Sequence, residues 1–77
     1  MTRLTQYNLS KSEWNHLIDE WIIGRNAERD RQILRRRLLD GITFERLAEE
    51  FDLSTQRVHE IVYRTQEILL KHTAEKQ

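Results

Sequence analysis

The apolar residues of this 77-residue chain recur at helical spacing, and no stretch alternates apolar and polar residues as a half-buried strand does. The clearest stripe steps by three, one, three and one residues: Trp14, Leu17, Ile18, Trp21 and Ile22. The chain has no cysteine and no proline, so disulfides and proline kinks do not shape it. Such a chain can build a core only by packing helices, and we expect an all-α fold.

Capping residues and glycines divide the pattern into four helices. Ser10 followed by Glu13 makes a capping box, and the expected caps of the later helices are Asn26, Thr43 and Ser54. Gly24 and Gly41 would end the first two helices. The helices are expected over about residues 9–23, 27–39, 44–50 and 55–71, in one domain over 1–77. The first eight and last five residues fall outside the pattern and are expected to fray.

Residues 43–71 predict two helices that cross at a steep angle over a short turn. Ala48 is small where the helices would cross, and Leu53 would plug the turn into the core. Asp52 stands where many such turns have glycine, and Asp adopts the left-handed conformation more readily than most residues. This pattern is typical of a C-terminal helix-turn-helix, whose second helix can lie in the DNA major groove. The remaining inward positions are predicted as Ala27, Ile33, Leu34, Leu38, Phe44, Leu47, Phe51, Val58, Ile61, Val62, Ile68 and Leu69.

The charges cancel in sum but not along the chain. The 13 basic and 13 acidic residues give a net charge of zero, which argues against a globally basic nucleic-acid binder. Residues 24–40 hold six arginines against three acids, a balance of +3, and residues 41–53 hold one arginine against four acids, a balance of −3. This arginine block is interpreted either as a solvated helix face with i,i+4 pairs or as a binding surface.

Several classes of function lack their signature. The histidines His16, His59 and His72 lie 43 and 13 residues apart, which fits no zinc-ligand spacing, and we expect His16 and His72 at the surface. There is no Ser-His-Asp set and no glycine-rich phosphate loop. No apolar run exceeds three residues, the length of Trp21 to Ile23, which is too short for a membrane span or signal peptide. We expect a cytoplasmic protein with no enzymatic activity, metal, cofactor or small-molecule ligand.

Four sequence elements carry a resemblance to a known family. They read Arg29-x-x-x-Ile33-Leu34-x-x-Arg37, Gly41-x-Thr43-x-Glu45-x-Leu47-Ala48, Leu53-Ser54-x-x-Arg57-Val58-x-x-Ile61, and Leu69. Together they make residues 27–71 similar to region 4 of bacterial RNA polymerase sigma factors, the part that binds the promoter −35 element. A −10-recognition region would not fit in 77 residues, so the resemblance implies a free-standing module of bacterial, phage or mobile-element origin. LuxR-type regulators carry similar strings and remain an alternative.

The resemblance implies two sets of DNA-contacting residues. It places basic and hydroxyl side chains near phosphates, where guanidinium groups fit phosphate oxygens: Arg29, Arg37, Thr43, Arg57 and Arg64. It places one outward face of the last helix near the bases: Thr55, Gln56, His59, Glu60 and Tyr63. Gln can bind adenine through two hydrogen bonds, and Glu can accept from the cytosine amino group. The alternative is an ordinary solvated face on which Arg57 pairs with Glu60 or Glu49.

The predicted function is that of a sequence-specific DNA-binding transcription regulator. Glu49 falls where the family often has a basic residue that contacts a phosphate. With an acidic third helix, we expect only about three or four phosphate contacts and weak DNA binding by a monomer. Trp14 and Trp21 are expected in the core; alternatively, they form a homodimer seam or dock RNA polymerase. A protein-interaction module that uses these tryptophans or the arginine block is the second hypothesis.

Overall fold

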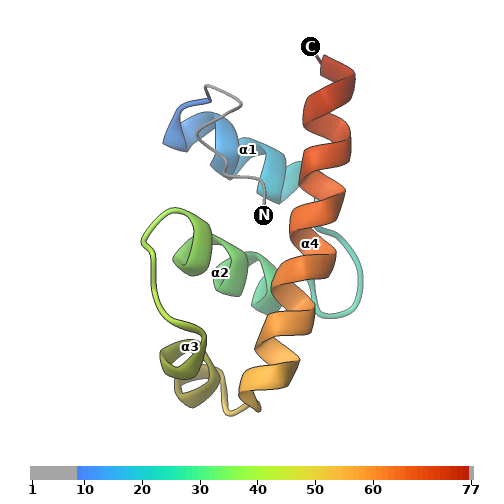
Figure 1. Cartoon of the computed structure of the whole chain (residues 1–77). Coiled ribbons are helices and arrows are strands. Elements are labelled where there is room, and N and C mark those ends of the chain that lie inside the picture. The colour runs from blue at the N-terminus through green and yellow to red at the C-terminus, as the bar shows by residue number, and fades with distance from the viewer. Residues whose placement is uncertain (1–8, 77) are drawn as a thin grey trace.

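The computed structural model describes residues 9–76 and consists there of four α-helices without a strand (Figure 1). In chain order they are α1 (Lys11–Trp21), α2 (Ala27–Leu38), α3 (Phe44–Phe51) and α4 (Thr55–Lys76). The all-α prediction is confirmed. The end predicted near residue 71 is wrong, because α4 continues to Lys76. The first eight residues, which were expected to fray, lie outside the described residues, and the extent of the domain stays a prediction.

The predicted capping box starts α1. The Ser10 hydroxyl accepts a hydrogen bond from the Glu13 N–H over 3.2 Å, and the Ser10 N–H donates to the Glu13 carboxylate over 3.0 Å. The hydrogen bonds from the backbone and the side chain of Ser10 lower the pKa of Glu13 below its ordinary value. The anionic Glu13 also lies in the first turn, where the helix dipole favours negative charge.

Side-chain caps also fix both helices of the helix-turn-helix. The Thr43 hydroxyl accepts from the Arg46 N–H over 3.2 Å at the start of α3. The Ser54 hydroxyl accepts from the Arg57 N–H over 3.0 Å at the start of α4. Asn26 stands at the cap position of α2, but its side chain makes no capping hydrogen bond, so this prediction holds for the position and not for the bond.

Asp52 closes the turn between α3 and α4 in the left-handed conformation, with φ 55° and ψ 47°. Of the described residues other than glycine, it is the one with positive φ. The Leu53 N–H donates to the Ala48 carbonyl over 2.9 Å, which satisfies a carbonyl at the C-terminal end of α3. The left-handed turn expected from the sequence is confirmed.

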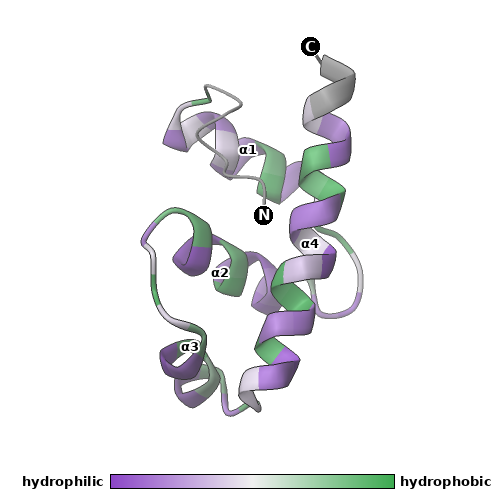
Figure 2. Cartoon of the chain, viewed as in Figure 1, coloured by the Kyte–Doolittle hydropathy of each residue, from purple (hydrophilic) through white to green (hydrophobic). Residues whose placement is uncertain are grey.

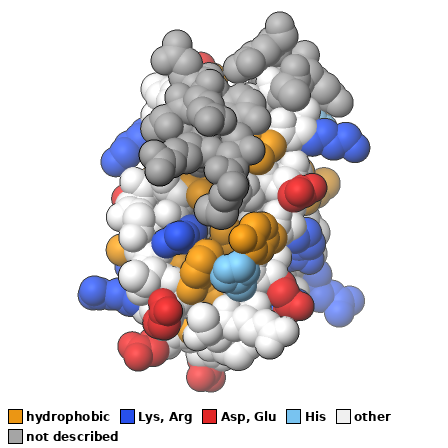
Figure 3. All heavy atoms as spheres, in the orientation of Figure 1, with side chains coloured by type: hydrophobic (Ala, Val, Ile, Leu, Met, Phe, Trp, Pro, Cys, Tyr) orange, Lys and Arg blue, Asp and Glu red, His pale blue; other side chains and the backbone are white. Residues whose placement is uncertain are grey.

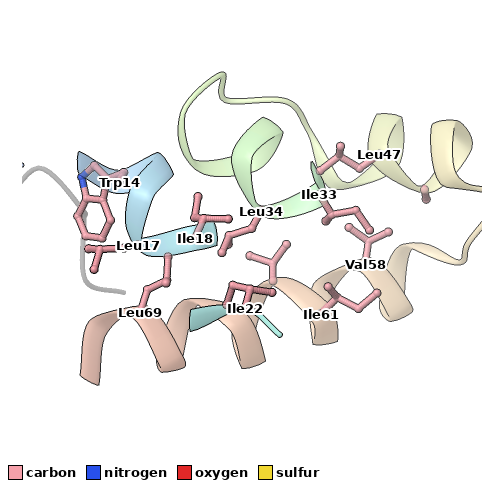
Figure 4. Packing of buried hydrophobic residues seen from close by; sticks show 12 residues of the cluster. Trp14, Leu17, Ile18, Ile22, Ile33, Leu34, Leu47, Val58, Ile61 and Leu69 are labelled. Atoms are coloured by element: carbon pink, nitrogen blue, oxygen red, sulfur yellow. The ribbon is translucent and has the colours of Figure 1, made fainter. Parts of the chain in front are cut away.

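The core lies between α4 and the other three helices, each of which contacts α4 (Figure 4). Hydrophobic and hydrophilic bands succeed one another along α4, as expected for a helix with one buried face (Figure 2). Among the described residues, twelve apolar side chains are buried: Trp14, Leu17, Ile18, Ile22, Ile33, Leu34, Leu47, Ala48, Val58, Ile61, Val62 and Leu69. Each large aliphatic side chain among them contributes about 1.5–3 kcal/mol by leaving water. Trp14 is 4% exposed, which confirms that it belongs to the core.

Two threonines of α4 are buried among these apolar side chains, which the sequence analysis did not predict. The Thr65 hydroxyl donates to the Ile61 carbonyl over 2.7 Å, and the Thr73 hydroxyl donates to the Leu69 carbonyl over 2.9 Å. These bonds satisfy both hydroxyls within α4 itself, so the helix can bury them at little cost. Of the helices described, none is both long enough and apolar enough to span a membrane.

Replacing Asp52 with glycine should stabilise the protein. Glycine adopts positive φ without the steric cost that a Cβ atom imposes, so we expect Asp52→Gly to raise the free energy of unfolding by about 0.5–1 kcal/mol. Urea denaturation at moderate salt measures this change. Asp52→Ala should destabilise. The control Asp40→Gly, at an exposed position without positive φ, should also destabilise. A loss of stability in Asp52→Gly would contradict the assigned turn.

Candidate nucleic-acid interface

The five residues predicted to read bases lie together on the outward face of α4. Thr55, Gln56, Glu60 and Tyr63 are exposed and His59 is half-buried. They line one open hollow of about 780 Å³ together with Arg64 and Glu67. The opposite face of α4 carries the buried Val58, Ile61 and Val62, which fixes the outward direction of the polar side chains.

His59 is not a freely solvated side chain, because it lies between two other rings. Its ring centroid is 4.4 Å from that of Phe44 and 4.6 Å from that of Tyr63, and both ring pairs are tilted by about 50°. The Arg37 guanidinium lies over the ring of Phe44, 4.3 Å from its centroid. We call Arg37, Phe44, His59 and Tyr63 the aromatic row. The sequence pattern places these residues on three separate helices and does not indicate their contact.

Arg29 and Arg64, two of the predicted phosphate contacts, converge on the carboxylate of Asp30. Arg64 Nη2 donates to Asp30 Oδ2 over 2.7 Å, and Arg29 Nε donates to Asp30 Oδ1 over 3.1 Å. Asp30 is 5% exposed and is therefore a buried charge held by two cations. Because 34 residues separate Asp30 from Arg64, no local pattern in the sequence indicates this pairing.

Two arginines of the arginine block join α2 to the end of α1. Arg31 donates to the Ile22 carbonyl over 2.7 Å and to the Asp19 carbonyl over 3.0 Å. Arg35 donates to the Asn15 side chain over 2.7 Å and also pairs with the Asp19 carboxylate. The last turn of α1 carries no basic residue of its own, so α2 supplies the cations that satisfy its carbonyls and its dipole.

The same helix also binds α3. Arg36 pairs with Glu50 over 2.9 Å, while Arg46 lies 3.9 Å from the same carboxylate. Neither interpretation of the arginine block anticipated this use, since i,i+4 pairs stay within one helix and a binding surface requires unpaired side chains. Of the described arginines between residues 24 and 40, Arg25 alone has no such partner. The local +3 charge is therefore mostly committed to packing.

Arg57 and Thr43 remain exposed beside the outward face of α4. The expected alternative partner of Arg57, Glu60, does lie nearby, but at 3.8 Å between exposed side chains this pair holds Arg57 weakly. Arg46, which the sequence analysis did not select, is also exposed, with 71% of its side chain accessible. Its position three residues after the capping Thr43 is the signal that could have indicated it.

The tryptophan pair does not form an exposed seam. Trp14 is in the core, and Trp21 is half-buried under His72, whose ring is stacked on it at 3.5 Å between centroids and 7° between planes. The expectation that His72 lies at the surface is wrong for this reason. His16 is exposed as expected and lies 3.4 Å from Glu20.

The surface shown in Figure 3 carries acidic and basic side chains of both signs around a histidine flanked by hydrophobic side chains. Within residues 9–76, no three His, Asp or Glu side chains gather closely enough to hold a metal ion. The outward face of α4 can therefore form hydrogen bonds and ring contacts with a partner.

The family model described as "Sigma-70, region 4" matches residues 27–68. This range contains α2, α3 and the first fourteen residues of α4, with every residue predicted to contact DNA. The sequence resemblance is thereby confirmed, and α1 lies outside the matched range. No curated protein and no solved structure matches the chain.

Removing the Asp30 carboxylate should weaken the fold. Asp30→Ala leaves Arg29 and Arg64 without their shared partner, and we expect a loss of about 2 kcal/mol in the free energy of unfolding. This is less than for a fully buried pair, because both arginines keep access to water. Urea denaturation measures it, with Asp40→Ala as the exposed control. Equal stability of the two variants would show that the Asp30 pairs are not coupled to folding.

Proposed function

Because this chain belongs to the sigma-70 region 4 family, we propose that it binds double-stranded DNA as a transcription regulator through the helix-turn-helix of α3 and α4. The observation that carries the proposal is the gathering of Thr55, Gln56, Glu60 and their neighbours on one outward face of α4. No catalytic role is proposed, since the hollow over this face offers hydrogen-bonding groups without a nucleophile activated by a base.

Base recognition is assigned to the first turns of α4. In a helix-turn-helix the second helix lies in the major groove and its N-terminal residues contact base edges. Gln56 has the amide that can bind adenine through two hydrogen bonds, and Glu60 has the carboxylate that can accept from cytosine. Both side chains are exposed, so neither has to break a buried contact to reach a base.

Phosphate contacts are assigned to the exposed residues that flank this face. Arg57 and Arg46 have accessible guanidinium groups, and the Thr43 hydroxyl can donate a hydrogen bond to a phosphate while it accepts one from the backbone. Arg29 and Arg64 would have to leave Asp30 to bind a phosphate, although the Arg64 side chain is still 57% exposed. Few cations are therefore available to DNA, and we expect a shallow dependence of affinity on salt.

RNA polymerase is proposed as a second partner, because the free protein has little charge with which to hold DNA. Glu45 and Glu49 are exposed on α3, the helix that crosses the DNA backbone in this motif. Their negative charges would repel the phosphates. Polymerase bound alongside could supply the missing contacts with DNA. A homodimer is not proposed, since the buried Trp14 removes the seam on which it depended.

Gln56→Ala should lose preference at one base pair. If Gln56 binds adenine, its loss should cost about 1–3 kcal/mol of discrimination at that position and little elsewhere. Selection from random duplexes at low salt, with and without RNA polymerase, followed by titration of single-base variants measures this. The control Gln32→Ala removes an exposed amide from α2. Failure of the wild-type protein to select any sequence under both conditions would refute the proposed function.

Arg57→Ala should weaken binding to all sequences alike. A variant with one phosphate contact fewer releases fewer counterions when it binds DNA. The magnitude of the slope of log affinity against log salt concentration should therefore fall by about 0.9. Lys71→Ala is the matched control, because Lys71 is an exposed cation on the same helix about 21 Å further along. If both variants lower the slope equally, Arg57 contributes only general charge.

A further inference from the structure

The aromatic row connects α2 to the outward face of α4 through the first residue of α3. Arg37 lies 4.3 Å from the Phe44 ring, Phe44 lies 4.4 Å from His59, and His59 lies 4.6 Å from Tyr63. One end of the row is therefore a half-buried cation of α2, and the other end is a ring among the base-reading residues.

Arg37 is held at two points at once. Its Nη1 donates to the Ile42 carbonyl over 3.1 Å, in the segment between α2 and α3, while the planar guanidinium covers Phe44. The hydrogen bond fixes the segment that leads into α3, and the cation–π contact fixes the ring at the start of α3. Both contacts hold Arg37 in place, although the family resemblance assigned it to a phosphate.

The far end of the row is an accessible aromatic ring. Tyr63 is 47% exposed, which makes it one of two large hydrophobic side chains that are exposed among the described residues. His59 lies between Tyr63 and Phe44, so its ring cannot turn without losing contact with both neighbours. Rings held in this way lose less rotamer entropy on binding than free side chains would, which is the benefit of a preorganised site.

We propose that Arg37 is a positioning residue for base recognition, which orients His59 and Tyr63 through Phe44, and that these two rings contact the C5-methyl group of a thymine. Thymine is the base that presents an apolar group in the major groove, and an aromatic edge is a suitable partner for it. The inference rests on the proposed function, since it concerns which base this helix-turn-helix reads.

A positioning role and a phosphate contact have opposite consequences. A phosphate contact contributes equally at every sequence, and its loss lowers the salt slope. A positioning residue touches no DNA, so its loss changes the preference between sequences and leaves the slope unchanged. Arg37→Lys separates the two roles, because lysine keeps a point charge suited to phosphate but lacks the planar group that covers Phe44.

The first experiment measures affinity for the selected site and for its thymine variants, across a salt range, in Arg37→Lys and Arg37→Ala. Both variants should lose up to about fourfold in discrimination at one thymine position, the contribution expected of one methyl contact, with the salt slope of the wild type. Arg25→Lys and Arg25→Ala are the controls, since Arg25 is an exposed arginine outside the aromatic row. The proposal would be overturned in favour of a phosphate contact if Arg37→Lys kept the base discrimination of the wild type and Arg37→Ala had a salt slope smaller in magnitude by about 0.9.

The second experiment tests the methyl contact itself. Deoxyuridine in place of that thymine removes only the C5-methyl group and should weaken wild-type binding about fourfold, the effect expected for one buried methyl group. Tyr63→Phe should keep this sensitivity and Tyr63→Ala should lose it. Equal affinity of the wild type for the thymine and deoxyuridine sites would reject the assigned contact.

A measurement without DNA keeps the inference separate from the proposed function. NMR shifts of the His59 and Tyr63 ring protons should change in Arg37→Lys but not in Arg25→Lys, with equal melting temperatures as the check on folding. If the wild type selects no DNA, the proposed function fails while these shifts still report the positioning. If the ring shifts do not change in Arg37→Lys, the positioning role is refuted even where DNA binding holds.

Discussion

Burial of the apolar face of α4 is the interaction on which the whole molecule depends. α1, α2 and α3 each pack against this one helix, and its residues Val58, Ile61 and Leu69 are almost fully buried. The opposite face of the same helix carries the residues proposed to read DNA. Recognition and stability are therefore coupled geometrically, because a rotation of α4 that changed its outward face would also move its buried one.

The arginines of α2 add directionality to this nonpolar packing. Hydrophobic burial does not depend on exact angles, whereas hydrogen bonds from Arg31 to the end of α1 and from Arg36 to Glu50 on α3 fix the orientation of both neighbours. Asp30 adds a third link, through Arg64, to α4. A chain with zero net charge thus uses most of its local positive charge within the fold.

The helices and their core followed from the sequence, because capping residues and helical periodicity are local signals. Ser10, Thr43 and Ser54 cap as predicted, and Asp52 takes the left-handed turn. The pairing of Asp30 with Arg64 and the stacking of Trp21 on His72 were not predicted, since they join residues 34 and 51 positions apart that only tertiary packing brings together. The site residues do share a face, and their roles on DNA stay predictions.

The aromatic row also bears on how the DNA sequence preference proposed for this domain could be re-engineered. His59 and Tyr63 belong to α4, but their orientation depends on a ring from α3 and a guanidinium from α2. Grafting the outward residues of α4 onto another scaffold would transfer the side chains without the groups that orient them. The unit that has to be transplanted is the contact network across three helices, and the recognition helix alone is not a separable module.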